Sequence, residues 1–189
     1  DPSSIIQSVS QLRIVLVETS HPGNIGAVAR AMKTMAIDDL VLVRPQYFPH
    51  AEATARASAA SDVLERARVV GSVEEAVADC GFVAATTSRE REHNFRVLDL
   101  RDAAARLVAE AARGTAAILF GAERTGLTNQ ELALAHVLIR IPANPEYPSL
   151  NLAMAVQLTT YELYRARGAN YQQPAAAVPL ATGEEMERM

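Results

Sequence analysis

Short apolar runs alternate with amphipathic stretches along most of the chain. The runs are rich in β-branched and aliphatic residues, and we predict strands at 13–17, 40–43, 69–70, 82–86, 116–120 and 137–141. Between them, apolar residues recur every three or four positions, which predicts helices over 24–36, 51–66 (one or two helices), 72–79, 99–113, 128–135 and 150–167. The polar segment 87–98 is expected to be a loop.

Strands that alternate with helices of this length predict an α/β fold with a mainly parallel sheet and helices on both faces. The strand runs are continuously apolar, as expected for strands that are covered on both sides. We expect one domain over residues 1–168. After Gly168 the sequence GANYQQPAAAVPLATG is typical of a linker, so 169–189 are expected to be a tail that leads into a C-terminal helical extension.

Several residues are placed to cap the predicted helices. Ser72 with Glu75, and Thr128 with Glu131, have the spacing of a capping box. Asn24 is a suitable N-cap for the helix over 24–36, and Ser149 stands where an N-cap for the last helix is expected.

The composition is that of an ordinary globular protein, with 49% hydrophobic and 21% charged residues. A net charge of −4 argues against a surface that is basic all round but leaves a local basic patch open. The single cysteine, Cys80, cannot form an internal disulfide, and no apolar run approaches the length of a membrane span. We therefore expect a cytoplasmic protein, with an N-terminus that has been trimmed before Asp1.

Three turn segments follow predicted strands, and ligands bind beyond the carboxyl ends of strands in open α/β sheets. The first, His21–Arg30 (HPGNIGAVAR), has two glycines at a helix start, which favours an anion; Arg30 and Lys33 share one face of that helix. A capped helix with solvated basic residues explains the same pattern.

The second segment, Phe120–Leu127 (FGAERTGL), places Glu123 and Arg124 between two glycines. Gly121 would let a ligand lie against the backbone, although a surface ion pair in a tight loop is the simpler reading. The third segment, Ile141–Asn151 (IPANPEYPSLN), has three prolines that fix its backbone. It precedes a helix that is apolar on two sides, which indicates a subunit interface as well as a core.

Other chemistries lack their motifs. The histidines and Cys80 have no metal-ligand spacing, so no metal is expected. The sequence contains no Walker A motif, no G-x-G-x-x-G and no G-x-S-x-G.

In this order, the three segments resemble the motifs of SPOUT-class RNA methyltransferases of the TrmH/SpoU branch: N-x-G-x-x-x-R, then F-G-x-E-x-x-G-L, then I-P…S-L-N. The similarity covers about residues 12–167. The strings VETSHPGNIGAVARAMK, LFGAERTGLTNQEL and ANPEYPSLNLAMAVQ are most similar to the branch members that methylate a ribose 2′-hydroxyl in the tRNA anticodon loop, at position 32.

The resemblance implies a C-terminal trefoil knot, S-adenosylmethionine as the cofactor, tRNA as the partner, no metal, and a homodimer with its site near the interface. The cofactor residues implied are Thr86, Thr87, Ser88, Gly121, Ile141, Pro148, Ser149 and Leu150. The catalytic residues implied are Arg30, Glu123, Ser149 and Asn151, and the expected RNA contacts are Asn24, Arg30, Lys33 and Arg124. Arg30 would act on the 2′-hydroxyl either as a base or as an electrostatic stabiliser.

Three alternatives stay open: a ribosomal RNA methyltransferase of the same class, an RNA-binding protein without catalysis, and a Rossmann-like nucleotide-binding enzyme. The acidic chain must also bind a polyanion, so a further C-terminal segment is expected to supply tRNA contacts.

Overall fold

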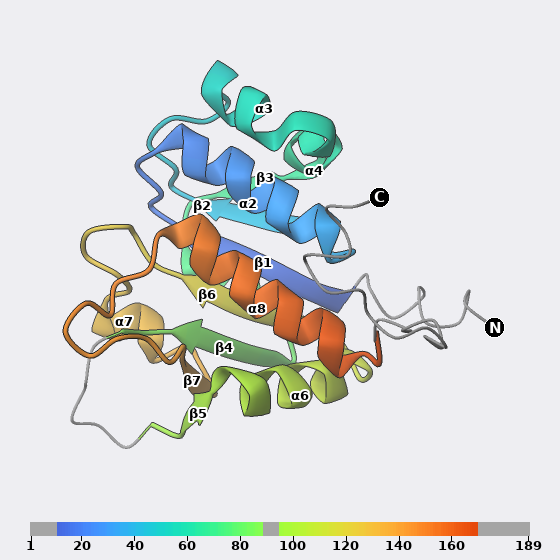
Figure 1. Cartoon of the computed structure of the whole chain (residues 1–189), viewed down its shortest axis with the longest axis vertical. Coiled ribbons are helices and arrows are strands. Elements are labelled where there is room, and N and C mark those ends of the chain that lie inside the picture. The colour runs from blue at the N-terminus through green and yellow to red at the C-terminus, as the bar shows by residue number, and fades with distance from the viewer. Residues whose placement is uncertain (1–10, 89–94, 170–189) are drawn as a thin grey trace, which may run out of the picture.

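The protein, in a computed structural model that describes residues 11–88 and 95–169, is built on one parallel sheet (Figure 1). The described part contains seven strands: β1 (Leu12–Val17), β2 (Asp39–Val43), β3 (Arg68–Val70), β4 (Phe82–Thr86), β5 (Val97–Asp99), β6 (Ala116–Phe120) and β7 (Val137–Arg140). Their order in the sheet is β3-β2-β1-β6-β4-β7-β5, and every pairing is parallel. The predicted α/β class is confirmed.

Helices cover both faces of the sheet. They are α2 (Pro22–Thr34), α3 (Ala51–Ala57), the 3₁₀ turn η2 (Ser58–Ala60), α4 (Ser61–Arg66), α5 (Val73–Val77), α6 (Leu100–Ala111), α7 (Asn129–Leu132) and α8 (Leu152–Ala166). On one face α8 lies between α2 and α6, and α3 packs on the outer side of α2 (Figure 1). Alternate residues of β1 point to opposite faces: Ile14 and Leu16 join the core under these helices, and Val15 and Val17 join the core under α5 and α7.

The strand at Val97–Asp99 was not predicted, because it is only three residues long and lies at the end of a polar segment. It pairs with β7 at the edge of the sheet. Part of the predicted loop 87–98 lies outside the described residues, and so does the predicted tail apart from residue 169. The trefoil knot stays a prediction.

Two predicted N-caps are wrong. The N-cap of α2 is His21, with Pro22 at the first helical position, so Asn24 lies inside the first turn. The N-cap of α8 is Asn151, whose side chain accepts a hydrogen bond from the Ala153 backbone N–H; Ser149 lies earlier, in the loop. The Asn24 side chain instead donates to Glu123, and Asn151 combines its capping bond with a hydrogen bond to Asn24, as described below.

The two predicted capping boxes differ in outcome. Thr128 and Glu131 form a complete box at the start of α7. Ser72 caps α5 by accepting from the Glu75 backbone N–H, but the Glu75 carboxylate accepts from the Gly71 N–H instead of the Ser72 N–H. The second box is therefore only half formed.

A buried arginine holds the amino-terminal edge of the sheet. Arg13, on β1, donates to Asp39 at 2.8 Å and to the two Asp79 oxygens at 2.5 and 3.0 Å. Its Nη1 also donates to the Ala76 carbonyl. Only 7% of the Arg13 side chain is exposed, so its charge needs these acceptors. The hydrogen bond from Arg13 lowers the pKa of Asp79 to about 2.

We expect this pair to make stability depend on pH between about 4 and 2. In that window the unfolded Asp79 binds a proton while the folded carboxylate stays ionised, so the folded state loses relative stability as the pH falls. Asp79→Asn should lower the free energy of unfolding at pH 7, because it removes the ion pair with Arg13. The loss should be only roughly 1 kcal/mol, since the Asp79 side chain is 63% exposed and solvent screens the pair. The deficit should shrink toward pH 2.

Urea unfolding of both proteins at neutral and acidic pH measures this difference. The matched control is Asp102→Asn, whose exposed carboxylate has no ion-pair partner among the described residues. A deficit for Asp79→Asn that stayed constant across the range would contradict the expectation.

Candidate active site

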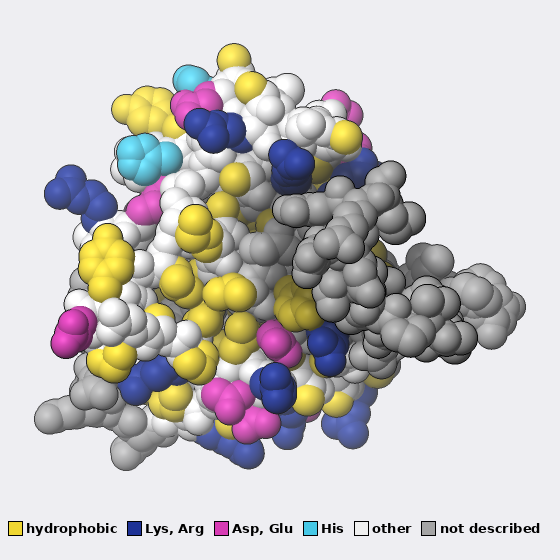
Figure 2. Space-filling view, in the orientation of Figure 1, with side chains coloured by type: hydrophobic (Ala, Val, Ile, Leu, Met, Phe, Trp, Pro, Cys, Tyr) yellow, Lys and Arg dark blue, Asp and Glu magenta, His cyan; other side chains and the backbone are white. Residues whose placement is uncertain are grey.

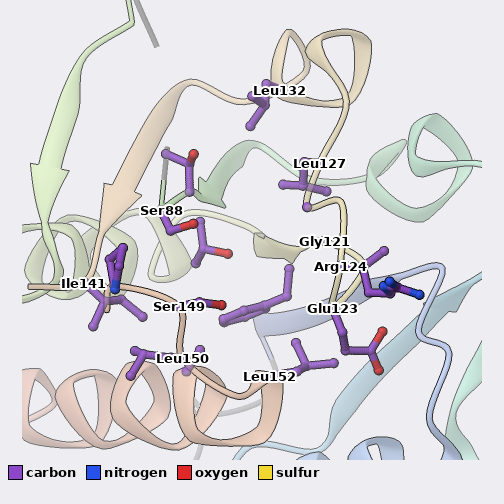
Figure 3. A pocket seen from close by; sticks show the side chains of 17 residues that line it. Ser88, Gly121, Glu123, Arg124, Leu127, Leu132, Ile141, Ser149, Leu150 and Leu152 are labelled. Carbon is purple, nitrogen blue, oxygen red and sulfur yellow. The ribbon is translucent and has the colours of Figure 1, made fainter. Parts of the chain in front are cut away.

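The loops that follow β4, β6 and β7 surround one pocket at the carboxyl edge of the sheet (Figure 3). Its volume is about 340 Å³. All eight residues that were expected to hold a cofactor line it: Thr86, Thr87, Ser88, Gly121, Ile141, Pro148, Ser149 and Leu150. These residues come from three segments far apart in the chain, and they meet because β6, β4 and β7 are neighbours in the sheet.

The pocket combines an apolar floor with a polar rim. Phe120, Leu132 and Leu152 contribute apolar side chains and are nearly fully buried. Ser88 and Ser149 contribute hydroxyl groups that point inward in Figure 3. The floor residues were not predicted as site residues, although each lies within a few positions of a predicted motif. A pocket of this kind suits a ligand with a flat apolar part and several polar groups.

The turn after β6 requires glycine at position 121. A Cβ atom on Gly121 would lie 2.3 Å from the Gly126 carbonyl carbon and 2.4 Å from the Leu127 backbone nitrogen. The turn closes through a hydrogen bond from the Gly126 N–H to the Ala122 carbonyl, and Gly126 itself has a φ of +69°. Close backbone approach thus shapes this wall of the pocket.

Glu123 links the first and second segments. Its carboxylate accepts hydrogen bonds from the Ser20 N–H, the Ser20 hydroxyl, the His21 N–H and the Asn24 side-chain amide, at 3.0 to 3.2 Å. Burial raises the pKa of Glu123, but these donors outweigh that effect and hold the pKa below its usual value. A carboxylate that is ionised and fully occupied in this way is suited to positioning loops rather than to exchanging protons.

The third segment joins the same network through two asparagines. The Asn151 side-chain amide donates to the side-chain oxygen Oδ1 of Asn24 at 3.3 Å, while its own Oδ1 caps α8. Glu123, Asn24 and Asn151 therefore form one chain of hydrogen bonds across all three segments. The sequence motifs mark these residues, but the contacts depend on positions 127 residues apart and are not visible in the sequence.

We expect Glu123→Gln to loosen this network. Glutamine has nearly the same shape as glutamate, but one carboxylate oxygen is replaced by an NH₂ group that cannot accept a hydrogen bond. The donors that now bond to that oxygen would lose their acceptor, and each buried unsatisfied donor costs about 1–3 kcal/mol. The thermal midpoint should fall and the ligand affinity of the pocket should fall with it. Glu146→Gln is the control, because Glu146 is exposed in the loop 141–151 and its carboxylate has no partner in the described structure. An unchanged midpoint for Glu123→Gln would show that the network is not needed.

The basic residues that were predicted to contact RNA differ in whether they have an ion-pair partner and in whether they line the pocket. Arg30 is exposed on α2 and has no hydrogen-bond or ion-pair partner among residues 11–88 and 95–169. It does not line the pocket. Arg124 lines the pocket edge and is likewise unpaired within the described chain. Lys33 is paired with Asp62 at 2.7 Å, so an RNA phosphate would have to compete with this carboxylate.

The described residues provide neither a metal site nor a membrane-spanning helix. No group of three or more His, Cys, Asp or Glu side chains within them is arranged to hold a metal ion. Among the helices of the described chain, none has the length and apolarity to cross a membrane. Cys80 is half-buried, and burial raises the pKa of its thiol, so the thiolate form is disfavoured at neutral pH.

The parallel sheet and the pocket built from three strand-end loops define an α/β protein with a ligand site at the carboxyl edge of its sheet. The chain belongs to the SpoU rRNA methylase family, whose model matches residues 11–161. It is 45% identical over 183 residues to the tRNA (cytidine/uridine-2′-O-)-methyltransferase TrmJ of Photorhabdus laumondii, covering 95% of this chain and 76% of that protein.

Solved structures agree with this assignment. TrmJ of Z. mobilis superposes with a TM-score of 0.77 and 42% identity, covering 93% of this chain and 74% of that one. A structure described as giving insights into 2-OH methylation of C/U34 on tRNA superposes with a TM-score of 0.65 and 28% identity, covering 82% of this chain and 95% of that one.

Proposed function

We propose that the protein methylates a ribose 2′-hydroxyl in the anticodon loop of tRNA, at position 32, with S-adenosylmethionine as the methyl donor. The observation that carries the proposal is that the second and third motif segments line one pocket, while the first segment is joined to them by the hydrogen bonds among Glu123, Asn24 and Asn151. The 45% identity to a tRNA (cytidine/uridine-2′-O-)-methyltransferase over most of both chains supports the substrate class.

The pocket fits this cofactor. S-adenosylmethionine carries a flat purine, a ribose, and an amino-acid end, and the apolar floor with its polar, backbone-rich rim offers partners of each kind. Phe120 and Leu132 are placed for the purine, while the turn at Gly121 brings backbone close to the ligand without an intervening side chain. When bound, the cofactor supplies an activated methyl group on a positively charged sulfur.

The residues of the chain then have to orient a hydroxyl and stabilise its oxygen. Arg30 is assigned to the ribose, since its guanidinium is exposed and is not engaged by any described residue. A guanidinium stays protonated at neutral pH, so Arg30 stabilises the negative charge that develops on the 2′-oxygen. The hydroxyl proton passes to solvent water as the methyl group is transferred and S-adenosylhomocysteine is left. Glu123 and Asn151 position the loops, and Ser149 contributes a hydroxyl at the pocket wall.

The active form is proposed to be a homodimer. The outer face of α8 carries a stripe of exposed apolar side chains that includes Met154, Leu158 and Tyr161 (Figure 2). Water-exposed residues at this spacing on one long helix favour burial against a second copy. The position of Arg30 outside its own subunit's pocket supports a site that is completed at this interface. We further propose a cytoplasmic location, where tRNA is found, and a domain that spans 1–168 ahead of a tail at 169–189.

Incubation with labelled S-adenosylmethionine and unmodified tRNA tests the function. Methyl transfer followed by mass-spectrometric mapping of the nucleoside should give a 2′-O-methyl group at position 32. Methylation at position 34 would overturn the proposed position, and transfer only to ribosomal RNA would overturn the substrate. Absence of product from a folded, cofactor-binding protein would favour RNA binding without catalysis.

A further inference from the structure

One exposed aromatic side chain lies in a loop that is hydrogen-bonded to the segment before α2. Tyr47, in the loop between β2 and α3, is 58% exposed. The next residue, Phe48, is partly buried against the main core and anchors the loop beside it. The tyrosine ring is therefore presented to solvent from a fixed point.

Hydrogen bonds join this loop to the active-site network. The Gln46 backbone N–H donates to the Thr19 carbonyl at 3.1 Å, and Arg44 is paired with Glu18 at 3.0 Å. The segment that receives these bonds continues into Ser20 and His21, which donate to Glu123. The loop that carries Tyr47 is thus connected by hydrogen bonds, through residues 18–21, to the Glu123 carboxylate.

Two exposed arginines lie close to the segments that form this hydrogen-bond network. Arg56 of α3 lies against the start of α2, with its Cγ 3.7 Å from the Cβ position of Gly23. Arg56 and Arg124 are both exposed, and neither has an ion-pair or hydrogen-bond partner in the described chain. Glu52 lies with Arg56 near Gly23, and the ionised Glu123 directly precedes Arg124, so charges of both signs are present here. Figure 2 shows hydrophobic, histidine, basic and acidic side chains together at the end of the molecule where α3 packs on α2.

We propose that Tyr47 stacks on an unpaired base of the substrate RNA next to the methylated nucleotide, while Arg56 and Arg124 contact the adjoining phosphates. This inference rests on the proposed function and names a specificity-determining residue for it. Single-stranded RNA is recognised by aromatic rings on which splayed bases stack, combined with cations that follow the backbone. Tyr47 offers an exposed ring, and Arg56 and Arg124 offer guanidinium groups without an ion-pair partner in the described chain, which is the chemistry that such recognition needs.

The two kinds of contact predict different responses to salt. Phosphate contacts weaken steeply as salt rises, because binding releases counterions, whereas stacking does not. Tyr47→Ala should weaken binding of a labelled, unmodified anticodon stem–loop RNA about ten-fold at both low and high salt. Tyr47→Phe, which keeps the ring, should restore it. Arg56→Ala should instead reduce the salt dependence itself.

In steady-state assays the loss in Tyr47→Ala should fall on KM for tRNA, and affinity for S-adenosylhomocysteine should equal that of the parent. Val69→Ala, at an exposed apolar position on the edge strand β3, is the matched control. RNA affinity of Tyr47→Ala equal to that of the parent, or a loss that Phe does not restore, would overturn the stacking role. A parent protein that binds the RNA but transfers no methyl group would overturn the proposed function, and the comparison of alanine with phenylalanine would still decide the role of Tyr47.

Discussion

Replacing Arg30 with alanine is expected to lower kcat about 10²- to 10³-fold, the effect of removing one preorganised donor from a developing oxyanion. Arg30 is exposed on α2 and has no hydrogen-bond or ion-pair partner among the described residues, so its removal should leave the fold unchanged. It is also absent from the pocket wall, so the affinity for S-adenosylhomocysteine should stay the same. The loss should therefore appear in turnover alone.

Single-turnover methylation of tRNA with saturating cofactor measures this effect, and calorimetry with S-adenosylhomocysteine checks the pocket. Arg101→Ala is the control, since Arg101 is an exposed and unpaired arginine on α6. Arg30→Lys separates the two chemical roles. A lysine that restored turnover with a steep new dependence on pH would indicate proton transfer, and turnover of Arg30→Ala equal to that of the parent would refute any role.

The sequence predicts the sheet well because its strands are continuous apolar runs, and such runs have few alternatives to burial. It does not give their order, since β1 lies between β2 and β6 only after several crossovers along the chain. β5 escapes prediction because three residues at a sheet edge carry too little pattern. Local reasoning thus succeeds where burial alone decides the structure.

The same contrast holds for the site. The residues of the pocket could be predicted because each motif directly follows a strand, and the carboxyl ends of parallel strands share an edge. The roles of Asn24 and Asn151 could not. Asn24 has the local properties of an N-cap, but its side-chain amide donates to Glu123. Asn151 is the N-cap of α8, the position that Ser149 was expected to hold. For Asn24 a tertiary partner outweighs the local preference, whereas Asn151 both caps α8 and donates to Asn24.

Gly121→Ala should abolish cofactor binding, and the reason lies in the backbone rather than in any side chain. The new methyl group would lie 2.3 Å from the Gly126 carbonyl carbon and 2.4 Å from the Leu127 nitrogen. Neither atom can rotate away as a flexible side chain would, so the turn 121–127 must open. That movement displaces the wall of the pocket and pulls on Glu123, which holds the start of α2 through Ser20 and His21.

Two measurements follow this change. Calorimetry should show affinity for S-adenosylhomocysteine reduced at least ~100-fold, and overpacking should cost about 1–3 kcal/mol of stability. For a chain of this length that corresponds to a fall of several degrees in the thermal midpoint. Gly114→Ala is the matched control, because a Cβ there meets no atom within 4 Å. If Gly121→Ala bound the ligand as tightly as Gly114→Ala does, the close approach of Gly121 to Gly126 within this turn would have no part in forming the pocket. The cofactor would then have to be held elsewhere.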